Sequence, residues 1–160
     1  MERLAENYRA TIDYSVLARN IKDWGSELGF QQVGIADCEL GEAEARLLDW
    51  VGKGFHGEME YMERHGTKRT RPAELVPGTL RVIAARLNCN PPARAAEEVL
   101  ADGSRAFIAR YTLGRDYHKI VRGRLQKLAN RIGKEVGDFR YRVFTDSAPV
   151  MEVEIAQKAG

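Results

Sequence analysis

Apolar residues recur every three or four positions in three segments of the chain, which is the spacing of one buried face of an α-helix. These segments predict helices at about residues 15–28, 42–53 and 116–136. Asp13 or Ser15 is placed to cap the first helix. A glycine, which commonly terminates helices, follows each segment: Gly29, Gly54 and Gly137. The apolar stripe of the third helix consists of Tyr117, Val121, Leu125, Leu128 and Ile132.

Four other segments are rich in apolar, β-branched and aromatic residues, as β-strands are. They lie near residues 32–37, 79–89, 105–111 and 139–146. The second has apolar residues on both faces, which is typical of a central strand. Helices that alternate with strands predict a layered α/β domain, in which a sheet of about four or more strands is covered by helices. The pattern does not define the order of the strands.

The strand expected at 139–146 brings Asp146 to its carboxyl end. Pro149 then fits the first position of a helix, where its missing N–H costs nothing, with Ser147 or Ala148 in the cap position. Ligands of open α/β sheets bind at the carboxyl ends of strands, close to helix N-termini, so Asp146 is placed to meet one. Helix capping is the alternative role, because Asp between a strand and a helix is common turn chemistry.

Glycines and prolines divide the stretch from Gly54 to Gly78 into short helical pieces. It carries Met59, Tyr61 and Met62, and a basic turn follows, formed by Arg64, His65, Lys68, Arg69 and Arg71. Adaptable methionines beside cations can cover a ligand. A small satellite core beneath a surface loop is the commoner arrangement, and it is the one that we expect here.

The composition is that of a soluble globular domain, with 44% hydrophobic and 30% charged residues in 160. We expect a leading helix or tail at residues 1–14 and one domain at 15–160. No apolar run approaches the roughly 20 residues that span a bilayer, and the amino terminus lacks an apolar signal core, so we expect a cytoplasmic protein.

Cys38 and Cys89 form no Cys-x-x-Cys pair, which predicts buried free thiols. The three histidines lack zinc-site spacing, so we expect no metal site.

Charge is unevenly spread along the chain. Residues 1–66 carry 7 Lys or Arg against 13 Asp or Glu, whereas residues 67–160 carry 18 against 10. The basic second part indicates either a polyanionic partner such as a nucleic acid or a solvated basic face. No Gly-x-Gly-x-x-Gly follows a strand and there is no P-loop, which argues against ordinary dinucleotide and nucleoside triphosphate sites.

Short motifs are spread from about residue 15 to the last residue. They include Trp24-Gly-x-Glu-Leu-Gly-Phe30, Phe55-His-Gly-Glu-Met59, Arg64-His65-Gly66, Pro77-Gly78-Thr79, Leu113-Gly-Arg-Asp-Tyr-His-Lys119 and Asp146-Ser-Ala-Pro149 with Glu152. In this combination they resemble the amino-terminal region of the cobalamin-dependent, iron–sulfur epoxyqueuosine reductases, which complete queuosine in tRNA. The joint match is specific, although each piece alone is weak.

The resemblance implies a concrete function. Members of this family reduce the epoxide of epoxyqueuosine in tRNA to the cyclopentene of queuosine. Their amino-terminal part holds cobalamin on a fold similar to that of cobalamin-processing and reductive dehalogenase proteins, and a ferredoxin-like domain with two [4Fe-4S] clusters follows. The family's proton donor is the Asp of Asp-Ser-Ala-Pro, here Asp146. Burial against the apolar corrin would favour the protonated form that this role requires.

The resemblance also suggests roles for other residues. Arg64, Ser147 and Ala148 are expected to contact cobalamin, together with Asp146. Four residues of another matched segment are candidates for the corrin pocket or for the surface that meets the tRNA anticodon loop: Arg115, Tyr117, His118 and Lys119. An aromatic ring among cations suits an unstacked base and its phosphates. A packed loop and helix cap is an equally good explanation for these four residues.

Three departures from the family limit this expectation. The sequence stops at Lys158-Ala-Gly160, within a motif that continues toward the cluster domain in relatives, and it contains none of the cluster cysteines. Val153 stands where relatives usually have Arg. We therefore expect a truncated gene product or an excised domain. Such a chain would be inactive alone, or it would depend on a partner, either an electron donor or the missing iron–sulfur domain. The alternative is a corrinoid or tRNA binding module without catalysis.

Overall fold

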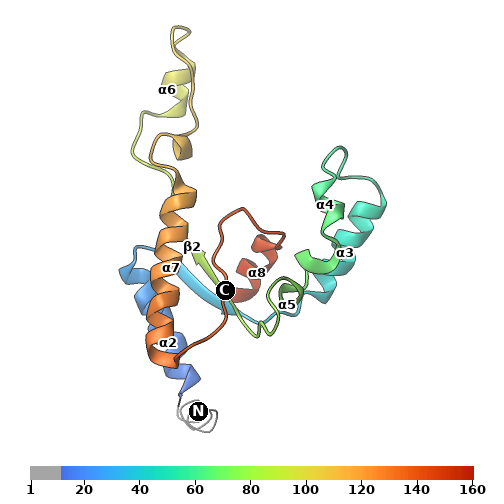
Figure 1. Cartoon of the computed structure of the whole chain (residues 1–160). Coiled ribbons are helices and arrows are strands. Elements are labelled where there is room, and N and C mark those ends of the chain that lie inside the picture. The colour runs from blue at the N-terminus through green and yellow to red at the C-terminus, as the bar shows by residue number, and fades with distance from the viewer. Residues whose placement is uncertain (1–11) are drawn as a thin grey trace.

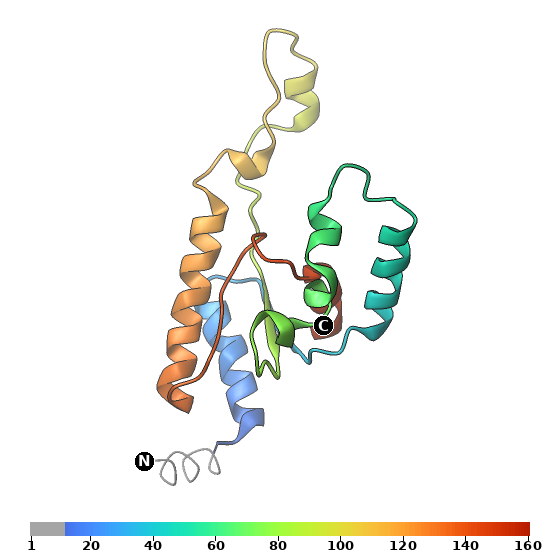
Figure 2. The ribbon, with the colours of Figure 1, turned by 45° about the vertical axis from the view of Figure 1, so that its right-hand side comes forward.

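The computed structural model describes residues 12–160, so most of the leading segment expected at 1–14 lies outside the described residues. The elements follow one another as α2 (Tyr14–Glu27), β1 (Gln32–Ala36), α3 (Gly41–Gly52), α4 (Tyr61–Arg64), η1 (Gly66–Arg69), α5 (Pro72–Leu75), β2 (Val82–Arg86), α6 (Ala96–Leu100), η2 (Arg110–Thr112), α7 (Tyr117–Val136) and α8 (Glu152–Ala159), where η marks a 3-10 helix. Figure 1 shows this arrangement, and Figure 2 shows it turned by 45°.

The sheet is much smaller than expected. Within residues 12–160 it consists of β1 and β2 alone, paired antiparallel from Gln32↔Arg86 to Ala36↔Val82. The prediction of about four or more strands is therefore wrong. Residues 105–109 and 139–149 contain no strand, although their composition suits one. Composition records how well side chains fit a pleated surface, whereas a strand also needs a neighbouring backbone in register, and these segments have none.

One face of the sheet is covered by α2 and α7. Their buried side chains form the main core with Val33 of β1 and with Phe30, which lies between α2 and β1: Ile21, Trp24, Val121, Leu128 and Ile132. Gly25 allows α2 to approach this closely, because a Cβ atom there would lie 2.3 Å from Val33 Cγ2. The buried stripe predicted for the helix at 116–136 is confirmed, with Tyr117 and Leu125 at its partly buried margin.

The other face of the sheet is covered by α8. Ile155 packs into a second core with Ala36, Leu40 and Ala43. Gly34 lets this helix lie against β1, because a Cβ atom at Gly34 would be 2.6 Å from the Ala159 carbonyl oxygen. The carboxyl-terminal helix is thus fixed against the sheet by close contact along its length.

Local signals predicted the three longest helices well. Asp13 caps α2 by accepting hydrogen bonds from the N–H groups of Ser15 and Val16. Gly137 ends α7 with a φ of 76°, in the region that favours glycine. The helix expected to start at Pro149 instead begins at Glu152, because the Met151 N–H bonds to the Arg69 carbonyl oxygen and the Val150 N–H to the Ala148 carbonyl oxygen, contacts outside the helix.

Two projections extend from this layered centre. In Figure 1, α3 and α4 stand side by side on one side, and the α6 segment extends beyond the amino-terminal end of α7. The short helices predicted between Gly54 and Gly78 are confirmed as α4, η1 and α5. Arg71 ties them to α3 through two hydrogen bonds to the Glu44 carboxylate, of 2.7 and 2.9 Å. None of the helices in residues 12–160 is long and apolar enough to cross a membrane.

Candidate active site around Asp146

Asp146 lies in the loop between α7 and α8. Its φ of 52° makes it the one non-glycine residue with positive φ among residues 12–160. Aspartate tolerates this left-handed conformation better than most residues, because its short polar side chain can bond locally. The alternative role, capping of the following helix, is not found: Met151 occupies the cap position of α8, and no side-chain hydrogen bond caps this helix. The carboxyl group is thus available for other contacts.

Two aromatic side chains from the start of α7 meet this carboxyl group. The Tyr117 hydroxyl donates a hydrogen bond of 2.5 Å to Asp146 Oδ2. His118 Nε2 lies 3.5 Å from the same oxygen, and His118 Nδ1 lies 3.0 Å from Asp116 Oδ1. Asp116 also caps α7 by accepting the His118 N–H. The two rings stack with centroids 4.1 Å apart, so residues from the start of α7 and from the loop that follows this helix form one cluster.

The acidic groups change the proton affinities of their neighbours. The hydrogen bond to Asp146, aided by desolvation, raises the pKa of Tyr117 to about 12, so the phenol stays protonated. Burial, and then the negative charge of Asp146, raise the pKa of Glu152 above its ordinary value. The hydrogen bond from His118 lowers the pKa of Asp116. A carboxyl group beside a tyrosine, a histidine and a second carboxyl group can hold and pass on a proton.

An open cleft of about 430 Å³ borders the cluster. Its lining includes three acidic residues, Asp146, Glu152 and Glu154, and one basic residue, Arg69. Its apolar lining comes from Leu47, Met62, Ala148, Val150, Met151 and Val153. The Arg69 guanidinium is held by the carbonyl oxygens of Tyr61 and Met62, at 2.8 and 3.3 Å. The Met-rich segment expected to form a satellite core thus contributes Met62 to a cleft beside Asp146.

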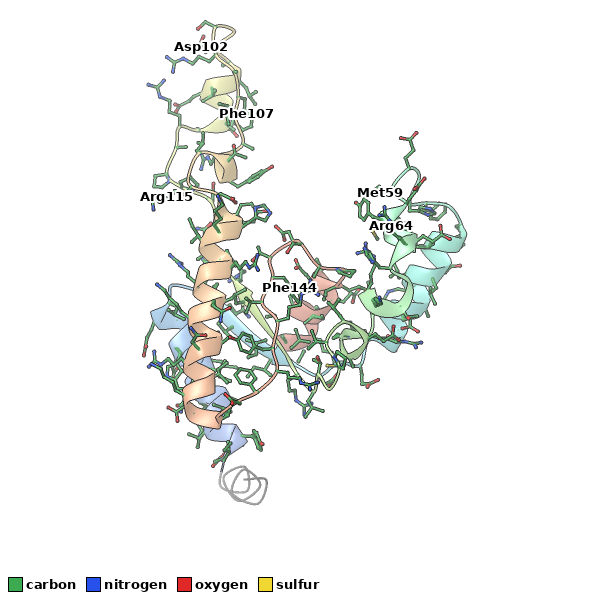
Figure 3. All side chains as sticks on the ribbon, in the orientation of Figure 1. Met59, Arg64, Asp102, Phe107, Arg115 and Phe144 are labelled. Carbon is green, nitrogen blue, oxygen red and sulfur yellow. The ribbon has the colours of Figure 1, made fainter. Side chains whose placement is uncertain are left out.

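The other predicted site residues are divided among different places. Ala148 lines the cleft, whereas the exposed Ser147 is not among the residues of its lining. Arg64 ends α4 on the projecting arm, across from Phe144, as Figure 3 shows. Arg115 and Lys119 line a second hollow of about 420 Å³ with Asp116 and Ile120. The structure therefore unites Tyr117 and His118 with Asp146 and places Arg64 apart from them.

Three residues of the site were not predicted as such: Asp116 and Glu152, which stand within matched motifs, and Arg69, which belongs to the basic turn. Asp116 had a visible signal, since an aspartate just before a predicted helix is a typical cap. The expected burial of Asp146 is not found within the described residues, because its side chain is 45% exposed. The two cysteines are free, as expected, but each is only partly buried.

The cleft suits a large apolar ligand that carries polar groups at its edge. Methionine, valine and leucine side chains supply adaptable apolar contact. The Thr145 hydroxyl, next to Asp146, is buried without a hydrogen-bond partner in the described part of the chain, but Thr145 does not line the cleft. The apolar side chains of the lining are of the kind that would contact the corrin ring of a corrinoid. In residues 12–160 no cluster of three or more His, Cys, Asp or Glu could hold a metal ion directly.

The fold is a two-stranded antiparallel sheet covered by helices, and a cluster of carboxyl, phenol and imidazole groups lies at the edge of its cleft. The family model described as "Epoxyqueuosine reductase QueG, DUF1730" matches residues 69–147, which include the cluster up to Asp146. The chain is 60% identical to an epoxyqueuosine reductase of Pseudomonas aeruginosa over 148 residues, which are 92% of this chain and 41% of that protein. The corresponding enzyme of Escherichia coli is 50% identical over 149 residues, 93% of this chain and 39% of that protein.

These matches identify the chain as similar to the amino-terminal region of the epoxyqueuosine reductases. It spans about two fifths of the length of these relatives. A solved structure described as selenomethionine-labelled epoxyqueuosine reductase superposes with a TM-score of 0.68, over 92% of this chain and 39% of that one. At 19% identity this likeness bears on the fold alone.

Proposed function

We propose that this chain forms the cobalamin-holding part of an epoxyqueuosine reductase, which reduces the epoxide of epoxyqueuosine in tRNA to queuosine, with Asp146 as the proton donor. The observation that carries the proposal is the placement of the Asp146 carboxyl group, bonded to Tyr117 at the rim of an apolar cleft. The similarity to epoxyqueuosine reductases of Pseudomonas aeruginosa and Escherichia coli supports the same reaction.

The chemistry matches what the chain offers. Opening an epoxide places negative charge on oxygen, and a carboxylic acid within hydrogen-bond reach neutralises that charge by giving up its proton. Cobalamin, when bound, supplies the reducing power for this step. Met62, Met151 and Ala148, which line the cleft, would contact it. Ser147, the exposed residue next to the acid, is expected to contact it as well. Arg64 would contact it from the projecting arm, which carries the guanidinium opposite the Asp146 loop.

The tRNA is expected on the basic side of the cluster. Arg115 and Lys119 lie at the amino-terminal end of α7, next to the Asp146 cluster, and are exposed. Cations beside exposed aromatic rings suit phosphates and unstacked bases. Electrons would reach the site from a partner or from protein outside these 160 residues, because the chain has only two cysteines and so cannot hold a four-cysteine cluster.

The test uses the Pseudomonas aeruginosa enzyme, with the substitution made at the position aligned with Asp146. Asp146→Asn keeps the size of the side chain and tolerates the left-handed backbone, but it cannot donate an acidic proton. We expect turnover to fall by roughly 10²- to 10⁴-fold, with cobalamin still bound as judged from the visible spectrum. Retained turnover would rule out Asp146 as the proton donor.

A binding experiment on the present chain tests the other half of the proposal. Cob(II)alamin mixed with the purified chain should bind in a one-to-one ratio by equilibrium dialysis, with a changed visible spectrum. A folded chain that leaves the spectrum unchanged would show that this region does not hold cobalamin by itself. Binding by the chain together with full turnover of the Asp146→Asn enzyme would favour a corrinoid-binding module without a catalytic acid.

A further inference from the structure

A proton donor must be held in place, and the backbone around Asp146 does not do this alone. The residue is exposed, its loop has no regular secondary structure, and it caps no helix. Effective catalytic groups are held to within about 0.5 Å by neighbours whose own positions are locked by packing. Rigid groups that contact the carboxyl group are therefore needed to hold it.

Tyr117 meets this requirement. It is the first residue of the 20-residue helix α7 and packs against the main core. Its ring also stands edge-on to Tyr111, with centroids 6.2 Å apart and an interplanar angle of 82°. The hydroxyl that reaches Asp146 Oδ2 at 2.5 Å is therefore carried by a ring fixed on two sides.

His118 adds a second contact to the same oxygen. Its ring lies between two carboxyl groups, with Nδ1 3.0 Å from Asp116 Oδ1 and Nε2 3.5 Å from Asp146 Oδ2. Asp116 is itself fixed by the cap of α7, and the His118 ring stacks on Tyr117. Asp116 and Tyr117 thus set the position of the imidazole from two directions.

We propose that Tyr117 and His118 are positioning residues, which hold Asp146 by its Oδ2 atom in the place from which it gives its proton to the epoxide oxygen. This inference rests on the proposed function. Once Asp146 has donated its proton it is a carboxylate, and the O–H···O bond from Tyr117 becomes charge-assisted and stronger. Tyr117 keeps its own proton throughout, in line with its raised pKa. It therefore stabilises the product of proton transfer without taking part as an acid.

The decisive variant is Tyr117→Phe at the aligned position of the Pseudomonas aeruginosa enzyme. It keeps the stacked ring and its packing and removes only the hydroxyl group. We expect kcat to fall roughly 10- to 100-fold with KM little changed, because the acid is displaced while substrate binding is not. Tyr111→Phe is the matched control: it removes a hydroxyl from the neighbouring ring, for which the described residues provide no hydrogen bond, and turnover should stay within about twofold.

His118→Gln should lower kcat less than Tyr117→Phe does, because the contact that it removes is 3.5 rather than 2.5 Å long. Full activity of Tyr117→Phe, in an enzyme that Asp146→Asn inactivates, would overturn the positioning role and leave the proposed function standing. Full activity of Asp146→Asn would remove the proposed function itself. An equal fall in Tyr117→Phe and Tyr111→Phe would assign the effect to ring packing and would also overturn the inference.

A spectroscopic measurement on the present chain tests the contact without catalysis. With ¹³C-labelled tyrosine, the Tyr117 signal, identified by its loss in Tyr117→Phe, should titrate near pH 12, above the ordinary value of 10. Asp146→Asn should move this titration to lower pH, because the hydrogen bond and the negative charge that hold the phenol proton are both gone. An unchanged titration in Asp146→Asn would show that the two side chains do not meet in solution.

Discussion

The contact of α8 with the sheet can be tested through Ile155. This side chain is 2% exposed and joins Ala36, Leu40 and Ala43 in the second core. The helix also carries Glu152 and one side of the cleft beside Asp146. Ile155→Ala should therefore loosen both the fold and the site.

The magnitude follows from burial. Ile155→Ala removes three carbon atoms from a nearly fully buried position, which at about 0.8 kcal/mol each costs about 2.4 kcal/mol of transfer free energy. The cavity that remains adds to this, so we expect about 3 kcal/mol, within the roughly 2–5 kcal/mol measured for such changes. For a chain of this length, that corresponds to a melting temperature lower by about 6–12 °C.

Urea unfolding followed by circular dichroism measures this change. The midpoint should fall while the slope of the free energy of unfolding against urea stays the same. Val153→Ala is the matched control, because Val153 lies in the same helix and is 82% exposed, and its effect should stay within about 0.5 kcal/mol. Equal effects of the two substitutions would refute the reasoning, since α8 would then not be buried against the sheet through Ile155.

Two further predictions concern the sheet and the projecting arm. Gly34→Ala should lower the free energy of unfolding by about 1–3 kcal/mol, because its Cβ atom would lie 2.6 Å from the Ala159 carbonyl oxygen. Gly52→Ala in α3 is the control and should be neutral or stabilising, because there is open space around Gly52. Equal urea midpoints of the two variants would contradict the close approach of α8 to Gly34. Hydrogen bonds from Arg71, and to a smaller extent from Thr70, lower the pKa of Glu44 from its usual 4.5 to about 2. The stability that these bonds confer is therefore complete above pH 4.5 and is lost as the pH falls toward 2. Glu44→Gln should remove this part of the acid dependence in thermal melts between pH 2 and 6, and an unchanged pH profile would show that the ion pair contributes nothing.

The candidate site was predictable only where a local motif carried it. Asp146 was identified through the Asp-Ser-Ala-Pro motif, and Tyr117 and His118 through the matched segment that runs into the start of α7. Their contacts with the corrin or with tRNA stay a prediction, and what the sequence did not indicate is that both lie against Asp146, 29 residues from Tyr117 along the chain. Glu152 and Arg69 join the site through the cleft that α8 and the turn after α4 enclose. No spacing in the sequence predicts that these residues lie together.

The sequence by itself determined the elements whose stabilising contacts are local. The helices α2, α3 and α7 follow from apolar residues at helical spacing, from the Asp13 cap and from the Gly137 stop, all of which act within a turn or two of the backbone. Only the tertiary structure decided which extended segments pair. Strand formation depends on a distant partner in register, so β1 and β2 pair while residues 139–146 form the loop that holds Asp146. The site depends on the same kind of distant contact, because its carboxyl, phenol and imidazole groups meet only when α7 and the loop before α8 pack on the same core.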